Sequence, residues 1–518
     1  MTWLLVVLLC VALTPAARVG LKAPVWSELR SRPVLIPLLL VGVGASAMAF
    51  RWLYARSPSL LATVTVVAVA LSLGMWRRAR PSWGLRRRLP PGSLGLGASL
   101  DAIAEKDFYA RGAARWGPVF KMAQFHRPVV CITDLPLGLS VMESQRANLA
   151  QPRLPFGRLS PGNYIEFMND EHHARYRGIL RSALSGRVVN ECREGVQGAV
   201  REQFARIAAN SGTQGVSPDA FLERVAFVSM LRVLCGIAVD DERIDELQRL
   251  FGDLGAPRQF VERRPEQRVA PFTRLTALVR ELGVAIRDQI ALGQAPERSV
   301  LSELVRTDAA YLDDDILLGN LVLIVHVTRS NVQGLLRWVL KEHVDHPEHA
   351  QLLREAATVA SEGPSRVEAL ASNFVSETLR LHQSEYFYRA VVREIRIGEF
   401  RIPSGWLLRV GVRECHDNPA VFPDPHAFRP ERFATWHYAK TEYCPFSDGT
   451  HSCFGAGLAL MIARAAVTVL ALDFDGRVVT DGPAVRDGNR HWSHWRPSLA
   501  FTISLARRLP AIHEAAPH

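Results

Sequence analysis

One cysteine lies in a turn-rich loop whose residue types suit metal binding. The loop, FSDGTHSCFG, runs from Phe446 to Gly455, contains Cys453, and leads into an apolar stretch, Leu458 to Phe474, that is typical of a helix. Glycine at Gly449 and Gly455 lets the backbone turn sharply and pass close to a flat cofactor, where a Cβ would clash. Amides at the start of the following helix favour the thiolate form of such a cysteine. A thiolate bound to heme iron promotes cleavage of the O–O bond.

Two other interpretations of Cys453 are weaker. A buried free cysteine in an ordinary loop is the commonest intracellular use of this residue. A zinc site needs ligands at short spacing, whereas the nearest cysteine, Cys444, lies nine residues upstream. The loop matches the heme-binding signature F-x-x-G-x-[HR]-x-C-x-G of the cytochrome P-450 family at Phe446, Gly449, His451, Cys453 and Gly455. The chain therefore resembles a cytochrome P-450, which implies heme b (iron protoporphyrin IX) with Cys453 as the axial ligand of the iron.

A histidine and an arginine lie one helical turn apart before this loop. His173 and Arg177 are spaced i and i+4 in a helix-compatible stretch. Taken alone, a charged helix face explains them equally well. The resemblance implies that both hold a heme propionate and that Arg389 is a second propionate-binding arginine, a role that suits the planar, permanently charged guanidinium. The loop Pro155 to Met168 falls where the family contacts its substrate.

A second ordered motif pairs Glu377 with Arg380. Such a pair is often a surface ion bridge worth little. Here it precedes Phe428 to Phe433, FRPERF, which matches the family pattern F-x-P-x-R-F. The resemblance implies that Glu377, Arg380 and Arg432 form a buried ion-paired triad.

A long apolar helix, Ile316 to Leu340, is predicted after the N-capping acids Asp313 to Asp315. The resemblance implies that this helix crosses the distal face of the heme and that Thr328 is the catalytic threonine of the oxygen site. Val327 stands where the family carries an acid, and Val325 stands where it carries a small residue. Both departures predict an unusual proton-delivery route.

Three functions are compatible with these motifs. The first is a heme-thiolate monooxygenase that inserts one oxygen atom of O2 into an organic, mainly apolar substrate, with electrons from a ferredoxin or a flavoprotein reductase. The second is a peroxide-dependent peroxygenase, because the acid is absent and His326 and Arg329 are close by. The third is a heme protein that binds a ligand without turnover. If O2 is used, proton delivery is expected to be slow or to pass through His326, Ser330 or the substrate, so that O2 turnover is poorly coupled while the peroxide route stays open.

The first 76 residues contain three apolar runs, Trp3 to Ala17, Pro33 to Phe50 and Leu60 to Trp76. A spanning helix needs about 20 residues, in a range of roughly 17–25, and the second and third runs reach this range. A cleaved signal peptide is the alternative for the first run, but a basic start is missing. The sequence predicts a membrane anchor of two or three transmembrane helices in residues 1–80, a proline-rich hinge in 81–98, and a heme domain in 99–518.

Charge and composition indicate where the protein lies. Six arginines between 77 and 88 follow the third run, and positive flanks stay cytoplasmic, so the heme domain is predicted to face the cytoplasm. Of 62 basic residues only five are lysine, an Arg- and Ala-rich usage typical of a GC-rich, bacterial genome. The predicted location is therefore a bacterial cytoplasmic membrane, in contact with membrane lipid. Because basic runs are limited to this flank, no nucleic-acid binding is expected. Seven scattered cysteines indicate a reducing compartment.

From about residue 100 the apolar residues recur mainly at the helical period. Short strand-like pieces interrupt them at Pro128 to Thr133, Arg393 to Ile397, Leu407 to Val412 and Leu499 to Leu505. The predicted fold is mainly α with small β-sheets, as the resemblance also implies. The turn from His491 to Trp495 is either a substrate contact or an ordinary surface turn.

Overall fold

The structure is a computed structural model. It describes residues 105–124, 127–152, 164–168, 170–255, 266–359, 363–383, 385–486 and 495–508, with positions 57, 59, 89–95, 98, 101 and 102 before them. The three apolar runs of the predicted anchor lie outside the described residues. Contacts divide the chain into two compact units, Met1–Ala150 with Tyr388–Gly411, and Gln151–Phe387 with Val412–His518.

The first unit is built on a six-stranded sheet with the order β1-β2-β3-β8-β5-β4. The strands are β1 (Gly92–Ser93), β2 (Val119–Gln124), β3 (Arg127–Ile132), β8 (Leu407–Gly411), β5 (Tyr386–Val391, whose first two residues belong to the second unit) and β4 (Leu149–Ala150). β2 and β3 pair antiparallel, and β3 pairs parallel with β8. β1 pairs with β2, so Gly92 and Ser93 of the predicted hinge are part of this sheet.

The inner strand β3 shows why this sheet forms. Its residues from Val129 to Ile132 are apolar and fully buried, as expected for a strand that is covered on both faces. Helix α6 (Phe108–Trp116) packs on β2, and α7 (Leu135–Ser144) packs on β8. A separate hairpin joins β6 (Ile395–Ile397) to β7 (Phe400–Ile402).

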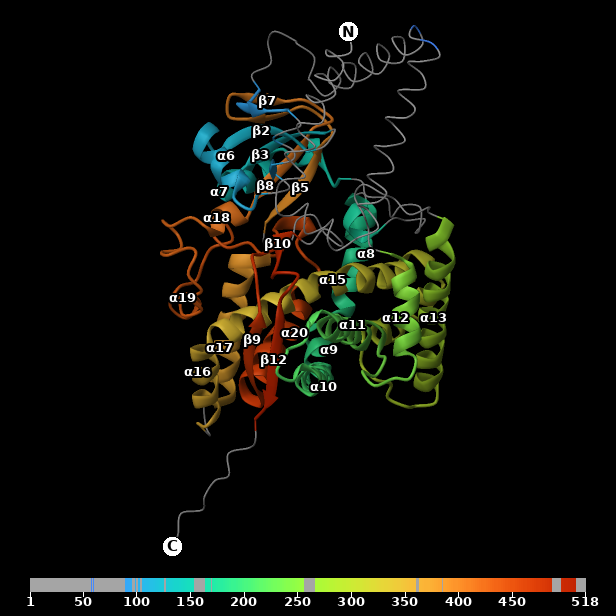
Figure 1. Cartoon of the computed structure of the whole chain (residues 1–518). Helices are drawn as coiled ribbons and strands as arrows, with labels where there is room; N and C mark the ends of the chain where they lie inside the picture. Colours follow the sequence, from blue (N-terminus) through green and yellow to red (C-terminus); the bar gives the residue numbers. More distant parts are fainter. Residues whose placement is uncertain are drawn as a thin grey trace. The chain divides into compact units, whose positions relative to one another are not determined.

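The second unit is mainly helical, and Figure 1 labels most of its elements. Its longer helices are α8 (Asp170–Ala183), α10 (Arg193–Ser211), α11 (Asp219–Cys235), α12 (Ile244–Asp253), α13 (Glu266–Ala291), α15 (Asp315–Asp345), α16 (Pro347–Ala357), α17 (Gly363–Thr378) and α20 (Ala456–Asp473). Shorter ones are α9 (Gly186–Glu191), α14 (Val300–Thr307), α18 (Arg413–His416) and α19 (Arg432–Thr435). Strand β9 (Phe474–Thr480) pairs with β12 (Thr502–Arg507), and β10 (Val485–Arg486) pairs with β11 (Trp495–Arg496).

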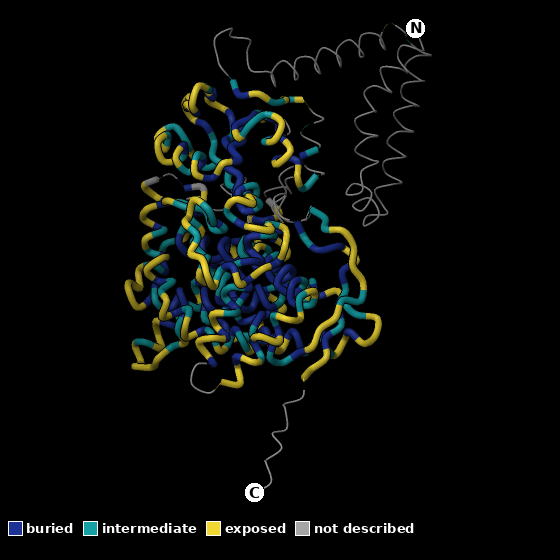
Figure 2. Tube along the Cα trace, turned by 90° about the vertical axis from the view of Figure 1, so that its left-hand side faces the viewer, coloured by how far each residue is buried: buried dark blue, intermediate teal, exposed yellow. Residues whose placement is uncertain are grey.

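Helix α15 lies at the centre of this unit, where it packs against α11, α13, α17 and α20. Asp314 caps it, because its Oδ1 accepts a hydrogen bond from the amide of Leu317 at 2.9 Å. The predicted cap is therefore confirmed, and the helix continues five residues beyond the predicted end at Leu340. Buried segments, dark blue in Figure 2, gather in the interior, and exposed segments, yellow, lie mostly at the outside.

Helix α20 follows the cysteine loop. By length and composition alone, it is the helix among the described residues that could cross a membrane. Residues such as Ile462, Ala463, Ala466 and Val467 are fully buried against neighbouring helices, and 56% of the helix is buried inside the protein. The prediction of a mainly α fold with small sheets is confirmed.

Candidate active site

The loop from Phe446 to Gly455 is closed by its own backbone. The amide of Cys453 donates to the carbonyl of Phe446 at 2.7 Å. Gly449 has a φ of 75°, a left-handed conformation that glycine adopts without steric cost. Ser447 has a φ of 61°, so the backbone is left-handed at this position too. The backbone of Gly455 precedes α20, and its N–H donates a hydrogen bond to the Cys453 thiol. The loop therefore places the sulfur at the start of α20.

Opposing effects act on the Cys453 thiol. Burial raises its pKa above the ordinary value, the hydrogen bond from Gly455 opposes this rise, and the charges of Glu166 and Arg177 act in opposite directions. The side chain still has exposed surface, because it faces a cavity. A cation at the sulfur would reverse the effect of burial and favour the thiolate outright.

A cavity of about 370 Å³ lies within the second unit, and Cys453 forms part of its wall. Residues 444–447 and 451–455, in and just before the cysteine loop, contribute one side. Helix α8, helix α15, the segment 164–166 and the segment 385–387 contribute the others. Its size falls within the usual range of small-molecule sites, which are about 300–1,000 Å³.

Basic side chains gather in one part of the wall. His173 and His451 stack with ring centroids 4.0 Å apart. The Nη2 atom of Arg177 donates to the carbonyl of Ser452 at 2.9 Å and to its Oγ at 3.0 Å. His173, Arg177 and His451 all line the cavity. The three basic residues that the sequence indicated therefore lie together.

One face of α15 forms another part of the wall. Ile324, Val327, Thr328, Asn331, Val332 and Leu335 line the cavity. At 100° per residue these positions share one side of the helix, and His326, Arg329 and Ser330 fall on the other. His326 is only 4% exposed, Arg329 donates to the carbonyl of Phe251 at 3.1 Å, and the Ser330 hydroxyl donates to the carbonyl of Val327 at 3.0 Å. Neither His326 nor Ser330 is among the described residues that line the cavity, and a proton route through them stays a prediction.

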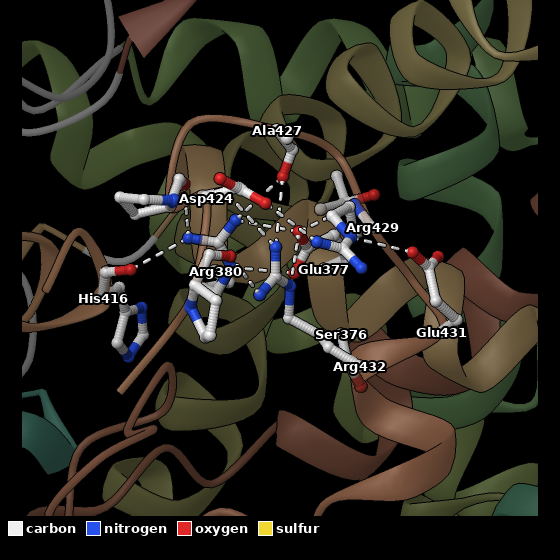
Figure 3. A network of polar contacts seen from close by, with 12 residues as sticks. Ser376, Glu377, Arg380, His416, Asp424, Ala427, Arg429, Glu431 and Arg432 are labelled. Atoms are coloured by element: carbon white, nitrogen blue, oxygen red, sulfur yellow. Dashed lines mark hydrogen bonds and ion pairs between the residues drawn. The ribbon is translucent and has the colours of Figure 1, made fainter. Parts of the chain in front are cut away.

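Glu377, Arg380 and Arg432 form a buried network, drawn in Figure 3. Arg380 donates from Nε and Nη2 to the two oxygens of Glu377, each at 2.8 Å. Arg432 donates to Oε1 at 3.1 Å, and so does the amide of Arg429 at 2.9 Å. Glu377 and Arg380 are completely buried. The fork geometry makes this a bidentate pair, the strong form of an arginine–carboxylate contact.

Other predicted residues lie elsewhere. Arg389 is in β5 within the first unit, and its Nη1 donates to the carbonyl of Tyr388 at 2.8 Å, so its propionate role stays a prediction. Of the turn 491–495, only Trp495 is described; it is buried, and its carbonyl accepts from Trp338 Nε1 at 2.9 Å. Most of the substrate loop 155–168 lies outside the described residues, but Tyr164 and Ile165 line the cavity.

Sequence reasoning missed two polar residues of the wall, Asn331 and Glu385, whereas Tyr164 and Glu166 lie within the predicted substrate loop. The helical period of α15 could have indicated Asn331, which is three residues after Thr328. The position of Glu385 depends on the chain after a π-helical turn, Leu379–Gln383, and no local pattern predicts it.

The residues present fit a heme. The Cys453 thiol, which faces the cavity at the start of α20, offers one axial ligand, and the basic side chains of His173, Arg177 and His451 can receive propionates. An added Cβ at Gly455 would meet no protein atom within 4 Å, so packing within the described protein does not require glycine there. In the part of the chain that the structure describes, no three His, Cys, Asp or Glu side chains gather to hold a metal ion.

Comparison with known proteins agrees with this fit. Residues 327 to 488 match the model of the cytochrome P450 family. The chain is similar to abscisic acid 8'-hydroxylase 3 of Oryza sativa subsp. japonica, 26% identical over 400 residues, which cover 72% of this chain and 78% of the relative. It is 23% identical over 431 residues to abscisic acid 8'-hydroxylase 2 of Arabidopsis thaliana, covering 78% and 87%. A solved structure, retinoic acid bound cyanobacterial CYP120A1, shares the fold with a TM-score of 0.64 and 20% identity, covering 82% of this chain and 100% of that one.

The fold, the thiol-bearing loop and the sequence similarity together support a cytochrome P450 monooxygenase. Both abscisic acid hydroxylases are plant proteins, and the solved neighbour is cyanobacterial, so the bacterial origin of this chain stays a prediction. The membrane anchor also stays a prediction.

Proposed function

We propose that this enzyme hydroxylates a small, mainly apolar organic molecule with O2, on a heme b held by the Cys453 thiolate. The observation that carries the proposal is the arrangement of the cavity. Its wall contains the Cys453 thiol, the basic side chains of His173, Arg177 and His451, and the face of α15 that carries Thr328. Two electrons per turnover would come from a ferredoxin or a flavoprotein reductase.

When bound, the heme would supply dioxygen activation, and thiolate ligation favours O–O cleavage. The chain's own residues would do the rest. The Gly455 amide stabilises negative charge on the sulfur, as expected of a hydrogen bond to a thiolate. His173, Arg177 and His451 would bind the propionates and set the orientation of the ring. Ile324, Val327 and Leu335 provide an apolar wall that excludes water and favours apolar substrates.

The test of the axial ligand compares two cysteines that line the same cavity. Cys453→Ala should abolish the strongly red-shifted band of the reduced carbon monoxide complex. Cys444→Ala should keep it, because burial raises the pKa of the Cys444 thiol to about 11 and favours the neutral form. The opposite pattern, with the band lost in Cys444→Ala and kept in Cys453→Ala, would contradict the proposal.

Two carboxylic acids are the first substrates to test, since relatives act on abscisic acid and the solved neighbour binds retinoic acid. Each acid should be titrated against the purified protein while the heme absorption spectrum is followed, and then supplied with reduced nicotinamide and redox partners. Product carrying one oxygen atom from labelled O2 supports the monooxygenase route.

A peroxygenase is the second candidate, favoured by one observation. Val327 lines the cavity at the position where the family carries an acid, so the usual proton donor is missing from this wall. Peroxide already contains the reduced oxygen and its protons. Product formed with peroxide alone, at a rate above that with O2 and reduced nicotinamide, would favour this candidate.

We also propose that residues 1–80 anchor the enzyme in a membrane with the heme domain on the cytoplasmic side. The three apolar runs and the arginines after the third support this proposal. Recovery of the full-length chain in the soluble fraction without detergent would contradict it.

A further inference from the structure

The cavity face of α15 contains one amide side chain. Asn331 lies three residues after Thr328 and four after Val327, so it stands one turn further along the same side of the helix. It lines the cavity, its side chain is exposed to that space, and it makes no hydrogen bond to another residue that the structure describes.

The neighbouring polar residues of α15 are committed elsewhere. Arg329 binds the Phe251 carbonyl, and the Ser330 hydroxyl binds the Val327 carbonyl within the helix. His326 is buried on the opposite side. Among the described positions of α15 that line the cavity, Thr328 and Asn331 alone are polar, because Ile324, Val327, Val332 and Leu335 are aliphatic.

We propose that Asn331 is a positioning residue that orders water for proton delivery, in the role that the missing acid at Val327 leaves open. The proposal rests on the monooxygenase function above. Hydroxylation consumes O2, one C–H bond, two electrons from the redox partner and two protons, and it yields an alcohol and water. On the α15 side of the cavity, apart from Thr328 and Asn331, the face that these protons pass is aliphatic.

An amide suits this task for a chemical reason. It offers two N–H donors and a carbonyl acceptor, so it can hold a water molecule between itself and the Thr328 hydroxyl. It does not release a proton itself near neutral pH, so the protons come from solvent through the ordered water.

The first test is spectroscopic and does not need turnover. The infrared C–O stretch of the reduced carbon monoxide complex should be recorded in H2O and D2O for wild type, Asn331→Ala, Asn331→Leu and Ser330→Ala. Loss of an ordered donor should shift the band and remove its D2O sensitivity in both Asn331 variants. Ser330→Ala, on the opposite side of the same helix, is the matched control and should retain the wild-type band.

The second test follows coupling once a substrate has been found. Product formed per reduced nicotinamide should fall about tenfold or more in Asn331→Ala, since general acid–base help is typically worth ~10²–10⁴-fold. Peroxide-supported product formation should change little, and Asn331→Asp should retain coupling.

Three outcomes separate the possibilities. An unchanged infrared band and coupling in Asn331→Ala, with a normal carbon monoxide complex, overturn this inference and leave the monooxygenase function intact. Weaker substrate binding with unchanged coupling also overturns it, because Asn331 would then contact substrate instead. Absence of a thiolate-type carbon monoxide complex in the wild type would contradict the proposed function itself.

Discussion

Glu377 is completely buried, and its Oε1 accepts three hydrogen bonds, from Arg380 Nη2, from the Arg429 amide and from Arg432 Nε. Arg380 also donates to the carbonyls of His416 and Pro425. A charge buried in this way is stable only while its partners remain, since desolvation alone would strongly disfavour it.

Arg380→Leu should therefore destabilise the protein severely. Removing one partner of a buried pair typically costs about 3–5 kcal/mol, because the remaining carboxylate is left uncompensated. Urea unfolding followed by circular dichroism should show a large fall in the midpoint. Arg187→Gln is the control, because the Arg187–Glu191 pair lies on the surface and such pairs contribute ~0–1 kcal/mol. Equal midpoints for the two variants would contradict the buried-network explanation.

The residues of the site differ in how far their positions follow from the sequence. Cys453, His451 and the glycines lie in one short loop, so spacing alone places them together. His173 and Arg177 follow from one helical turn. Their contact with the cysteine loop depends on tertiary packing, and the spacing of residues along the chain does not predict it.

At the scale of elements, a buried amide on α15 joins two parts of the cavity wall. The Oδ1 of Asn320 accepts from the amide of Ile165 at 2.7 Å, and its Nδ2 donates to the carbonyl of Ile316 at 2.8 Å. Asn320 is completely buried. The short 3-10 helix Ile165–Phe167 is thus fixed to α15, and Tyr164 beside it faces the cavity.

Asn320→Leu should release this segment. The Ile165 amide would lose its acceptor in a buried place, at a cost of about 1–3 kcal/mol. Hydrogen–deuterium exchange should rise over residues 164–168 while α20 stays protected. Unchanged exchange in that segment, with the heme content of wild type, would show that other contacts hold it.

Elements were easier to predict than their pairing. The helical period and the acids before it indicate α15, and the apolar run after Gly455 indicates α20. The parallel pairing of β3 with β8 joins residues far apart in sequence, as does the contact of Ile165 with Asn320. Such pairings depend on the whole chain and produce no local periodicity in the sequence.

At the scale of the whole molecule, buried neutral histidines make stability depend on pH. Burial lowers the pKa of His343 to about 4 and that of His416 to about 3, from an ordinary value near 6.5. Below pH 6.5 the unfolded chain binds protons that the folded chain does not, so the free energy of unfolding falls as pH falls.

In His343→Leu, the free energy of unfolding should depend less steeply on pH than in the wild type. Each such histidine contributes a slope of about 1.4 kcal/mol per pH unit between pH 6.5 and its folded pKa. Urea midpoints at pH 6.5, 6.0, 5.5 and 5.0 measure the slope, and the variant should show a smaller one than wild type. His437→Leu is the control, because that side chain is exposed in the folded protein. A slope equal to that of wild type would mean that His343 is protonated in the folded state.

The folded part should not need the N-terminal runs. A chain that starts at residue 89 retains Pro90 and Pro91, whose carbonyls accept hydrogen bonds from Lys121 at 2.6 and 2.7 Å. It should be soluble without detergent and give the same carbon monoxide spectrum as the full chain, measured after size-exclusion chromatography. Aggregation of this shorter chain would show that residues before 89 cover part of the fold.

Helix α15 also restricts how the chain length can vary. Further along the helix from Asn331, Arg337 donates to Asp219 at 2.7 Å, and Arg496 binds the same carboxylate at 2.6 Å. One residue inserted between Asn331 and Arg337 would rotate one end by 100° relative to the other, so that either the amide leaves the cavity or the arginine leaves Asp219. Homologous chains that retain both features should therefore differ from this one in that stretch by substitutions and not by insertions or deletions.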